Sequence, residues 1–337
     1  MSHPTVLTVV LNYKTAEMTL RAVEAVKDAM DGLSGGIAIV DNDSQDGSFE
    51  MLSREVASRD WDAEGRVRVI KSPRNGGFGA GNNVGIRAGL ADGSAPDYVY
   101  ILNSDAFPAP DALRILLDHL EATPETGFAG SYIHGPDGDT HLTSFRFPSI
   151  ASEFEGSIHF GPVSRLLRKY RVPIETPTET RTVDWLAGAS MLMRQSVLDE
   201  IGLFDETFFL YFEETDLCLR ARRAGHQTDY VPASKVAHIG SVSTGMKTWR
   251  RVPGYWFDSR WHYFSKNHGT LYAITATLAH VAGGALHRLR CLLTGRRPND
   301  PPRFLWTLLL HDFRALFRGR AEIREPATKG PVPNFHA

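Results

Sequence analysis

The first half of the chain alternates short apolar runs with longer amphipathic stretches. Four runs rich in Val, Ile and Leu predict strands: residues 7–13, 37–42, 67–71 and 98–103. Three stretches between them carry apolar side chains at helical spacing: residues 16–30, 48–58 and 80–91. A repeat of about 30 residues is the length of a strand–helix–strand unit. Because the strands are apolar on both faces, the pattern predicts a mostly parallel sheet with helices on both sides.

The pattern of the second half is less regular. Residues 134–181 are rich in Pro, Gly and polar side chains, which predicts an irregular insertion. Residues 183–206 predict a buried strand and then a short helix, and residues 213–224 predict a second helix. Residues 228–240 predict a strand followed by an extended loop, and the chain is expected to become helical beyond Lys266.

The composition is that of a soluble globular protein, with 42% hydrophobic and 23% charged residues among 337. A net charge of −2 gives no general attraction for nucleic acid. The charge is uneven, however, because residues from Met246 onward hold 15 Lys and Arg against five Asp and Glu. Two cysteines, Cys218 and Cys291, are too few for a disulfide framework, and the N-terminus lacks signal-peptide features. These features predict a cytoplasmic protein.

Polar residues follow all four predicted strands, in the segments NYK, DNDSQDGS, SPRNGGFGAGNN and NSD. Each segment alone is typical of turns and helix caps. The carboxyl ends of parallel strands meet at one edge of a sheet, however, where ligands bind in open α/β folds. A dinucleotide site is not expected, because the first strand–helix turn, LNYKTAE, contains no glycine, and the chain has no GxxxxGK[ST] loop.

Three acids follow a dense aromatic run in the segment FFLYFEETDLCLR, residues 208–220. Glu213, Glu214 and Asp216 could simply begin a helix, where acids complement the helix dipole and Asp216 can pair with Arg220. The aromatic run must be largely buried, and a carboxylate at the edge of an apolar wall is desolvated. Desolvation raises the carboxyl pKa toward the range of a general base. Both interpretations fit the spacing.

The segments together resemble family 2 glycosyltransferases, and in particular the bacterial rhamnosyltransferase-like branch. The resemblance rests on VVLNYKT, IVDNDSQDGS, RNGGFGAGNNVGI, YILNSD, DWLAGASMLMRQSVLDEIGLFDETFFLYFEETDLCLRARRAG and VAHIGSVSTG. It implies an α/β GT-A fold, with a Rossmann-like, mostly parallel sheet flanked by helices and a C-terminal helical extension. It implies a glycosyltransferase domain over residues 1–268 and a basic helical extension over residues 269–337. Within the first domain, the nucleotide-sugar half would cover about residues 1–130 and the acceptor half about residues 131–268.

The resemblance implies roles for the residues at the strand ends. Asp41 matches an aspartate that hydrogen-bonds the pyrimidine base of the donor, and Asn12 and Tyr13 would line the same pocket. A further set would complete the nucleotide site: Arg74, Asn75, Asn82, Asn103 and Ser104. A nucleotide-diphosphate sugar is therefore the expected donor.

The resemblance also implies a divalent metal, Mn²⁺ or Mg²⁺. The segment NSD occupies the place of the DXD motif, so Asp105 would be a metal ligand, whereas Asn103 supplies no carboxylate. His238 matches a histidine that completes the metal site in related enzymes, and an imidazole ligand favours Mn²⁺ over Mg²⁺. Such an ion would neutralise charge on the departing nucleoside diphosphate. The alternative for His238 is an ordinary structural histidine in a loop.

The resembling family carries its catalytic base in an acid pair that precedes DL by one residue. Aligned on TDL, the base position is Glu214, a Glu where the family has Asp, and the extra methylene moves the carboxylate by about 1.5 Å. The resemblance implies inverting single displacement, with Glu214 as base and with Glu213 and Asp216 orienting the acceptor or the helix. Trp185 would stack on a sugar or fill the core, and Gly188 would leave room for the donor sugar.

The expected function is therefore transfer of a deoxyhexose, such as rhamnose from dTDP-rhamnose, to a hydroxyl of a glycan or lipid-linked glycan in cell-surface polysaccharide synthesis. UDP-hexose transfer by the same fold is one alternative. A second is a non-catalytic nucleotide-sugar-binding module, in which Asn103 and Glu214 would be signs of lost activity. A third, a nucleotidyltransferase, should carry a basic, glycine-rich loop after the first strand, and LNYKT supplies none.

The C-terminal region bears on whether the protein contacts a membrane. Residues 269–287 contain no charged side chain other than His, carry apolar residues at helical spacing, and are followed by four arginines within ten residues. An amphipathic helix beside a basic patch predicts peripheral contact with the anionic inner face of the cell membrane. The equally favoured alternative is a helix packed on its own domain or on a homodimer partner.

Overall fold

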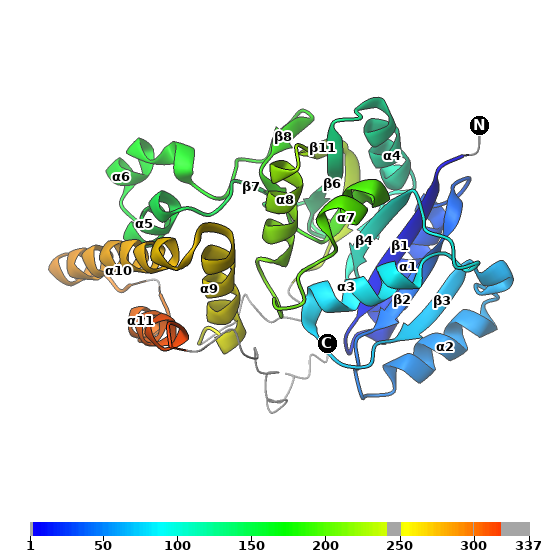
Figure 1. Cartoon of the computed structure of the whole chain (residues 1–337), viewed down its shortest axis with the longest axis horizontal. Coiled ribbons are helices and arrows are strands. Elements are labelled where there is room, and N and C mark those ends of the chain that lie inside the picture. Colours follow the sequence, from blue (N-terminus) through cyan, green and yellow to red (C-terminus); the bar gives the residue numbers. More distant parts are fainter. Residues whose placement is uncertain (1–2, 241–250, 299, 318–337) are drawn as a thin grey trace.

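The computed structural model describes residues 3–240, 251–298 and 300–317, and it contains a large mixed sheet beside a layer of helices (Figure 1). The sheet has nine strands in the order β3-β2-β1-β4-β10-β6-β11-β5, with β8 beside β11. Their bounds are β1 Thr5–Asn12, β2 Ser34–Asp41, β3 Val67–Lys71, β4 Tyr98–Asn103, β5 Ala106–Pro108, β6 Thr126–His134, β8 Arg181–Val183, β10 Ser190–Arg194 and β11 Gln227–His238.

The predicted strands β1 to β4 pair in parallel, as their two-sided apolar pattern requires. The register aligns Asn12 with Asp41 and Leu11 with Asn103, so the polar ends of β1, β2 and β4 meet at one edge. β10 runs antiparallel to both β4 and β6, and β5 and β8 run antiparallel to β11, which makes the sheet mixed. The predicted convergence of strand ends is confirmed.

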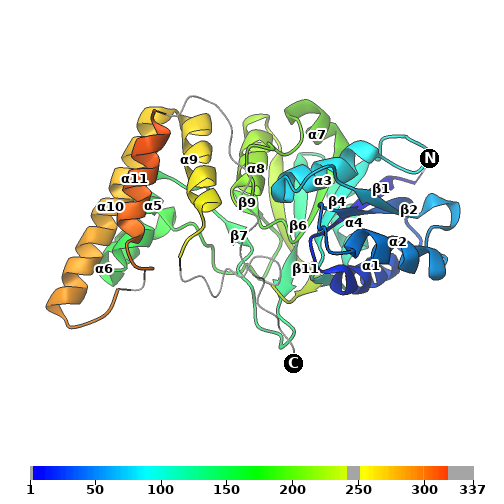
Figure 2. The ribbon, with the colours of Figure 1, turned by 90° about the horizontal axis from the view of Figure 1, so that it is seen from below.

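Helices cover both faces of this sheet (Figure 2). One face is covered by α1 Ala16–Ala29, α2 Ser48–Ser58 and α4 Ala112–Ala122, and the other by α3 Gly77–Ala88, α7 Gln195–Ile201 and α8 Glu213–Arg223. The helices α1, α2 and α8 match the predicted ranges within one residue. Helix α3 begins three residues earlier than predicted, because the Asn75 side chain accepts a hydrogen bond from the Gly77 backbone N–H at 3.1 Å.

The prediction of an irregular insertion over residues 134–181 was wrong for part of this range. It contains β7 Ser144–Phe145, which pairs with β9 Trp185–Leu186, followed by α5 Ile150–Ile158, α6 Gly161–Leu166 and the short 3₁₀ turn Arg168–Tyr170. Another 3₁₀ turn spans Ala63–Gly65. Helix α5 begins at a capping box, in which the side chains of Ser149 and Ser152 each accept a backbone N–H from the other residue.

The predicted loop near the end of residues 228–240 is also corrected. Strand β11 continues to His238, because a break in register between Val231 and Lys235 lets the chain pass Pro232 without losing its alignment with β6. Its last residues pair with β5, and His238 lies opposite Ala106. This continuation carries His238 to the same edge as Asp105.

The helical layer begins at Gly254, earlier than the predicted Lys266. It comprises α9 Gly254–His268, α10 Thr270–Leu293 and α11 Phe304–Ala315, together with α5 and α6, and it lies at the end of the molecule away from β3 (Figures 1 and 2). Helix α10 packs closely on α5, since a Cβ added at Gly283 would lie 2.2 Å from Ser157 Oγ. No helix in the described ranges is long and apolar enough to cross a membrane.

Candidate active site

Asn12, Asp41 and Ser44 form a buried cluster at the carboxyl ends of β1 and β2. Asp41 Oδ1 accepts hydrogen bonds from Asn12 Nδ2 at 2.7 Å and from Ser44 Oγ at 2.6 Å. Asp41 Oδ2 accepts the Ser44 backbone N–H at 3.2 Å. Tyr13, half-buried, follows directly on this cluster. The carboxylate of Asp41, only 1% exposed, is therefore held in one orientation at the predicted base pocket.

The glycine-rich turn before α3 fits tightly against the loop that precedes α8. Gly77 has a φ of +87°, and a Cβ there would lie 1.7 Å from the carbonyl oxygen of Phe209. Only glycine fits this position. Asn75 Oδ1 accepts from Asn42 Nδ2 at 3.0 Å, which joins the end of β2 to this turn. Arg74 is half-exposed beside it and pairs with Glu206 at 3.6 Å.

Two buried amide oxygens at this edge have no hydrogen-bond partner among the described residues: Asn42 Oδ1 and Asn82 Oδ1. The amide nitrogens of both side chains are engaged, since Asn82 Nδ2 donates to the Phe78 carbonyl at 3.0 Å and Asn42 Nδ2 donates to Asn75. A buried acceptor left unpaired costs about 1–3 kcal/mol. The arrangement suits a ligand that brings hydroxyl or amide donors to the edge.

The end of β4 brings Asn103, Ser104 and Asp105 beside the end of β11. His238 Nε2 lies 3.0 Å from Asp105 Oδ1 and 3.3 Å from Asn103 Nδ2. The Gly240 backbone N–H donates to Asp105 Oδ2 at 3.2 Å. Asp105 and Ser104 are buried, and His238 is partly buried. The two predicted metal ligands, 133 residues apart in sequence, are thus neighbours.

The chemistry of this pair fits a divalent cation. A carboxylate oxygen and an imidazole nitrogen are both ligands that such an ion accepts, and Asp105 Oδ1 and His238 Nε2 lie within hydrogen-bond distance of each other at 3.0 Å. In the described part of the chain no group of three or more His, Cys, Asp or Glu is arranged to hold a metal ion. The pair therefore offers two protein ligands at most from these residue types, and other positions would be open to diphosphate oxygens and water.

Glu213 and Glu214 begin α8 on the other side of the edge. Glu213 is 1% exposed, and its Oε2 has no hydrogen-bond partner among the described residues. Burial, reinforced by the neighbouring Glu214 carboxylate, raises the pKa of Glu213 well above its ordinary value. Glu214 is half-buried, and burial raises its pKa too, although the Gly188 backbone N–H, 3.3 Å from Oε1, opposes that rise. Both carboxyls therefore hold protons to higher pH than a solvated glutamate.

Asp216 lies on the buried side of the same helix and is fully engaged by its neighbours. Its Oδ2 accepts from Arg220 Nε at 2.9 Å, the predicted pair, and from Lys266 Nζ at 2.8 Å. Its Oδ1 accepts from Asn267 Nδ2 at 2.8 Å. These contacts join α8 to α9. Asp216 is thus situated to orient the helix and has no exposed surface for a substrate.

The turn into α8 is strained. Tyr211 and Phe212 both have a φ of +70°, a left-handed conformation that costs a non-glycine residue about 1–2 kcal/mol. The Phe212 ring packs against Tyr263 of α9, with centroids 5.4 Å apart. Strain of this kind persists only where the surrounding structure fixes it, and it concentrates at functional sites. Here it sets the direction in which Glu213 and Glu214 leave the turn.

Gly188 and Trp185 form the wall next to Glu214. A Cβ at Gly188 would lie 2.8 Å from the Phe78 ring and 3.5 Å from Glu214 Cγ. The Trp185 indole stacks on Phe145 at 4.1 Å with an interplanar angle of 17°. Its N–H donates to the Arg146 carbonyl at 2.9 Å, so one face and the polar edge of this ring are used within the protein. Trp185 remains half-buried.

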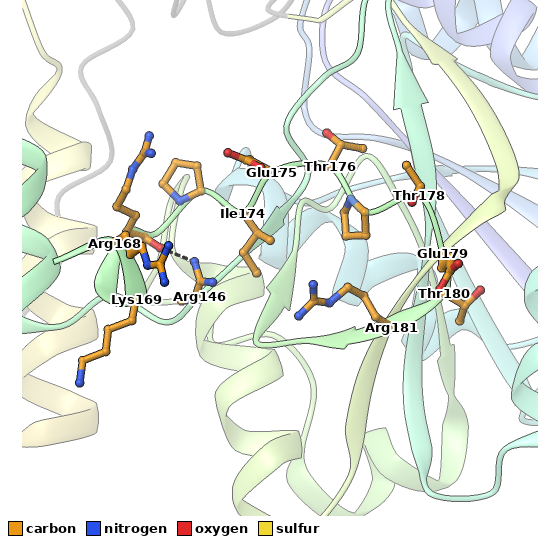
Figure 3. A pocket seen from close by; sticks show the side chains of 13 residues that line it. Arg146, Arg168, Lys169, Ile174, Glu175, Thr176, Thr178, Glu179, Thr180 and Arg181 are labelled. Carbon is orange, nitrogen blue, oxygen red and sulfur yellow. Dashed lines mark hydrogen bonds between the residues drawn. The ribbon is translucent and has the colours of Figure 1, made fainter. Parts of the chain in front are cut away.

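A pocket of about 880 Å³ opens beyond this wall, between the turn after α6 and β8 (Figure 3). Its lining includes five cationic side chains: Arg146, Arg168, Lys169, Arg171 and Arg181. Two glutamates and three threonines also line it: Glu175, Glu179, Thr176, Thr178 and Thr180. The pocket is separate from the strand edge and touches the Trp185 wall through Arg146.

The fold has solved counterparts. GalNAc-T7 with UDP, GalNAc and Mn²⁺ superposes with a TM-score of 0.56 at 14% identity, over 92% of this chain and 55% of that one. The mannosyltransferase PcManGT from Pyrobaculum calidifontis, in complex with GDP-Man and Mn²⁺, gives a TM-score of 0.52 at 16% identity, over 94% and 88%. The architecture is that of the GT-A glycosyltransferases.

Comparison with known sequences identifies the family to which the chain belongs among glycosyltransferases. The chain belongs to glycosyl transferase family 2, whose model matches residues 5–202. It is 31% identical over 222 residues to N-acetylglucosaminyl-diphospho-decaprenol L-rhamnosyltransferase of Mycobacterium tuberculosis, covering 62% of this chain and 68% of that protein. It is 31% identical over 165 residues to the rhamnosyltransferase WbbL of Escherichia coli, covering 48% and 60%. The predicted family is confirmed, and the protein is a glycosyltransferase.

Sequence reasoning missed several residues of the site. Asn42 and Ser44 stand in the quoted segment DNDSQDGS, but only its first aspartate was singled out. The signal was available, because Asp and Ser three residues apart commonly close a turn by side-chain hydrogen bonds. The basic run at residues 168–171 was a local signal for the pocket, whereas nothing in the sequence indicated that Arg146 and Arg181 would join it.

Proposed function

We propose that the protein catalyses inverting transfer of a sugar from a nucleotide-diphosphate donor to an acceptor hydroxyl, with Glu214 as the general base. The acceptor oxygen attacks the anomeric carbon, the bond from that carbon to the diphosphate oxygen breaks, and the acceptor proton passes to Glu214. The supporting observation is the setting of Glu214: a half-buried carboxyl of raised pKa that accepts the Gly188 backbone N–H, next to Ala189, whose carbonyl accepts the Asn103 backbone N–H at the end of β4.

The two neighbouring acids have different surroundings and hence different proposed roles. Glu213 is buried, its Oε2 has no hydrogen-bond partner among the described residues, and its raised pKa lets it keep its proton to higher pH, so it keeps the pocket from holding two adjacent negative charges. Asp216 holds α8 against α9 and positions the acid pair. Glu214 alone combines partial exposure with a raised pKa, which is the combination that a base needs.

We further propose that Asp105 and His238 hold Mn²⁺ or Mg²⁺. When bound, the ion would neutralise the charge that develops on the departing nucleoside diphosphate. Asn103 would orient His238 through its side-chain amide. Asp41, with Asn12 and Tyr13, forms the base pocket, and Arg74, Asn75, Asn82 and Ser104 line the path of the ribose and diphosphate.

The proposed donor is a nucleotide deoxyhexose such as dTDP-rhamnose, and the proposed acceptor is a lipid-linked glycan of cell-surface polysaccharide synthesis. The support is the similarity to rhamnosyltransferases, one of them named for a diphospho-decaprenol acceptor. Release of nucleoside diphosphate should be measured with dTDP-rhamnose and with UDP-hexoses, with and without Mn²⁺ or Mg²⁺. Turnover of dTDP-rhamnose alone supports the proposal, UDP-hexose turnover supports the neighbouring transferase, and no turnover with any donor favours a binding module.

The helical layer suits contact with the membrane that would hold such an acceptor. Helix α10 buries small residues, among them Ala273, Ala276 and Gly284, and exposes a stripe of leucines on its opposite face. The exposed leucines fall within about a third of the helix circumference at 100° per residue: Leu271, Leu278, Leu286, Leu289, Leu292 and Leu293. Packing on its own domain accounts only for the small-residue face, whereas a homodimer partner could also cover the leucines.

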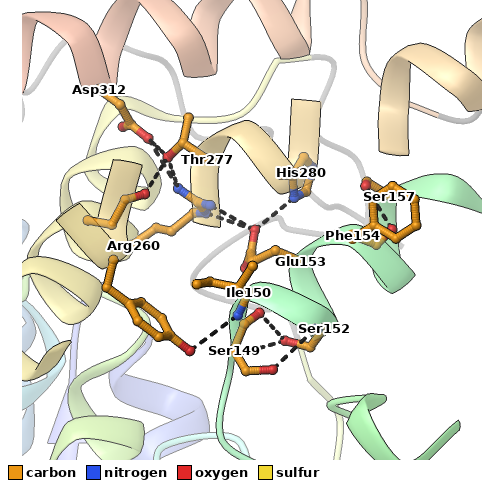
Figure 4. A network of polar contacts seen from close by, with 12 residues as sticks. Ser149, Ile150, Ser152, Glu153, Phe154, Ser157, Arg260, Thr277, His280 and Asp312 are labelled. Carbon is orange, nitrogen blue, oxygen red and sulfur yellow. Dashed lines mark hydrogen bonds and ion pairs between the residues drawn. The ribbon is translucent and has the colours of Figure 1, made fainter. Parts of the chain in front are cut away.

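A buried ionic network joins the helices of this layer (Figure 4). Arg260 of α9, 1% exposed, pairs with Glu153 of α5 at 2.8 Å and with Asp312 of α11 at 3.1 Å. His280 of α10 contacts Glu153 at 2.8 Å. Burial pushes the pKa of Glu153 up, but the charge of Arg260 and the contact with His280 hold it at about 2. Four helices thus meet at one charged centre.

We propose that an anionic membrane surface covers the leucine face. Arg288 and Arg290 flank the leucines on the helix, and the exposed Arg296 and Arg297 follow it, so cations border the apolar face. Flotation with phosphatidylglycerol vesicles should recover the protein and should fail for the variant Leu271→Glu/Leu278→Glu. If the wild type instead sediments as a dimer and ignores vesicles, the face is a homodimer contact.

A further inference from the structure

The basic pocket beyond Trp185 carries an unbalanced charge. Five cations and two carboxylates line it, and Glu155, outside the lining, pairs with Arg171, which leaves an excess of two positive charges. Within the described residues only one of the five has a carboxylate partner: Arg171, whose Nε lies 3.8 Å from Glu155. Among residues 3–240, 251–298 and 300–317, no ion pair of 4.0 Å or less engages Arg168 or Arg181. Like charges that share a pocket without counter-charges repel one another, so the pocket is electrostatically suited to an anion.

The cations line one pocket and come from residue 146, residues 168–171 and residue 181. Arg181 extends from β8 toward the side occupied by Arg146 and Arg168 (Figure 3). Arg146 is held in place, since its Nη1 donates to the Arg171 carbonyl at 3.0 Å and its backbone N–H donates to the Val172 carbonyl at 2.8 Å. A planar guanidinium presents paired N–H groups that match phosphate oxygens. Several such groups around one space are the usual means of recognising a phosphate ester.

The position of the pocket indicates that an anion bound there would belong to the acceptor and not to the donor. Arg146 follows Phe145, which stacks on Trp185, and Trp185 lies three residues from Gly188 beside Glu214. The pocket therefore joins the wall on the acceptor side and has no lining residue in common with the strand edge that would hold the donor. Leu166, at the end of α6 and two residues before Arg168, is 80% exposed. An exposed apolar side chain therefore stands close in sequence to the cations of the pocket.

We propose that this pocket binds the diphosphate of a lipid-linked acceptor. Such a molecule has a sugar, a diphosphate and an apolar chain in that order, and Glu214, the basic pocket and the exposed apolar residues of the helical layer follow the same order. The inference rests on the proposed transfer to a lipid-linked glycan and adds the group that selects the acceptor. The threonine hydroxyls of the lining offer further donors to phosphate oxygens.

The direct test is binding of farnesyl diphosphate in EDTA, where no divalent ion can support the donor site. The variant Arg168→Gln/Arg181→Gln removes two exposed cations of the pocket, and Arg54→Gln/Arg21→Gln removes two exposed cations elsewhere. We expect the pocket variant to weaken binding by about tenfold or more, because each charge-assisted contact contributes about that factor. The control variant and Asp105→Asn should bind as the wild type does. Equal binding by all four proteins, or no binding to the wild type, overturns the proposal.

Kinetics then separate this proposal from the proposed function. The acceptors are a glycosyl diphosphate lipid and the same glycosyl group on a neutral ether lipid. The pocket variant should raise the KM of the diphosphate acceptor about tenfold or more, while kcat, the neutral acceptor and hydrolysis of the donor by water stay unchanged. If the wild type turns over donor but uses both acceptors equally, the pocket assignment fails alone. If no donor is turned over, the transferase proposal fails.

Anionic headgroups are the other source of phosphate. If the pocket variant loses flotation on phosphatidylglycerol vesicles but keeps its KM for the diphosphate acceptor in detergent, the ligand is the membrane surface and the assignment to the acceptor is wrong. A single substitution, Lys169→Gln, repeats the kinetic comparison with a milder loss of charge. Because these side chains are exposed, the substitutions leave the core unchanged.

Discussion

Replacing Glu213 by Gln should make the protein less sensitive to alkaline pH. Glu213 is 1% exposed, its Oε2 lacks a partner among the described residues, and burial raises its pKa well above the ordinary 4.5. In the unfolded chain the same carboxyl ionises near 4.5. Between these two pKa values the folded state therefore holds a proton that the unfolded state releases, so stability falls as pH rises.

The magnitude follows from that single proton. The free energy of unfolding changes by about 1.4 kcal/mol for each pH unit between the unfolded and folded pKa values, and the loss ends once pH exceeds the folded value. Gln cannot ionise and removes this contribution, while it leaves one buried polar group of similar shape. The wild type and Glu213→Gln should therefore differ in stability by an amount that grows with pH, whatever constant offset the amide introduces.

Urea denaturation of both proteins at pH 5, 6, 7 and 8 measures this difference. Glu17→Gln is a matched control, because Glu17 is also an acid in the first turn of a helix but is exposed. Its difference from the wild type should not vary with pH. A difference between the wild type and Glu213→Gln that stays constant from pH 5 to pH 8 would refute the reasoning that burial keeps Glu213 protonated.

Three further predictions follow from other contacts. Gly188→Ala places a methyl group 2.8 Å from the Phe78 ring, so we expect transfer to fall by about 10²-fold with little change in melting temperature. Glu153→Gln leaves the buried Arg260 without its closest partner and should lower the free energy of unfolding by about 3–5 kcal/mol in urea. Asp105→Asn should abolish the thermal stabilisation by Mn²⁺ with nucleoside diphosphate while leaving the stability of the free protein nearly unchanged.

Much of the first half of the fold could be predicted from periodicity. The strands that end at Asn12, Asp41 and Asn103 are apolar on both faces, and that pattern together with the polar ends specifies parallel pairing and a shared edge. The acid pair was equally visible, because its aromatic run requires burial. The sequence did not indicate that Glu213 would be buried and Glu214 half-buried, because this difference depends on the strained turn at Tyr211 and Phe212.

The second half was harder because its order comes from contacts distant in sequence. The short helices α5 and α6 lie in a segment rich in Pro and Gly, and α5 is stabilised by packing against α10, more than 100 residues later. Strand β11 continues past Pro232 because pairing with β6 outweighs the local signal for a loop. The basic pocket brings Arg146 and Arg181 to the basic run of residues 168–171, and no local pattern predicts that approach.

The central claim, that Glu214 is the base of a sugar transferase, is tested most directly by donor turnover in two variants that differ by one position. Glu214→Gln and Glu213→Gln should be compared with the wild type for nucleoside diphosphate release in the presence of acceptor, after circular dichroism and melting curves have shown equal folding. We predict that Glu214→Gln lowers kcat by about 10²–10⁴-fold, while Glu213→Gln retains most of the rate. Near-full turnover by Glu214→Gln would contradict the account.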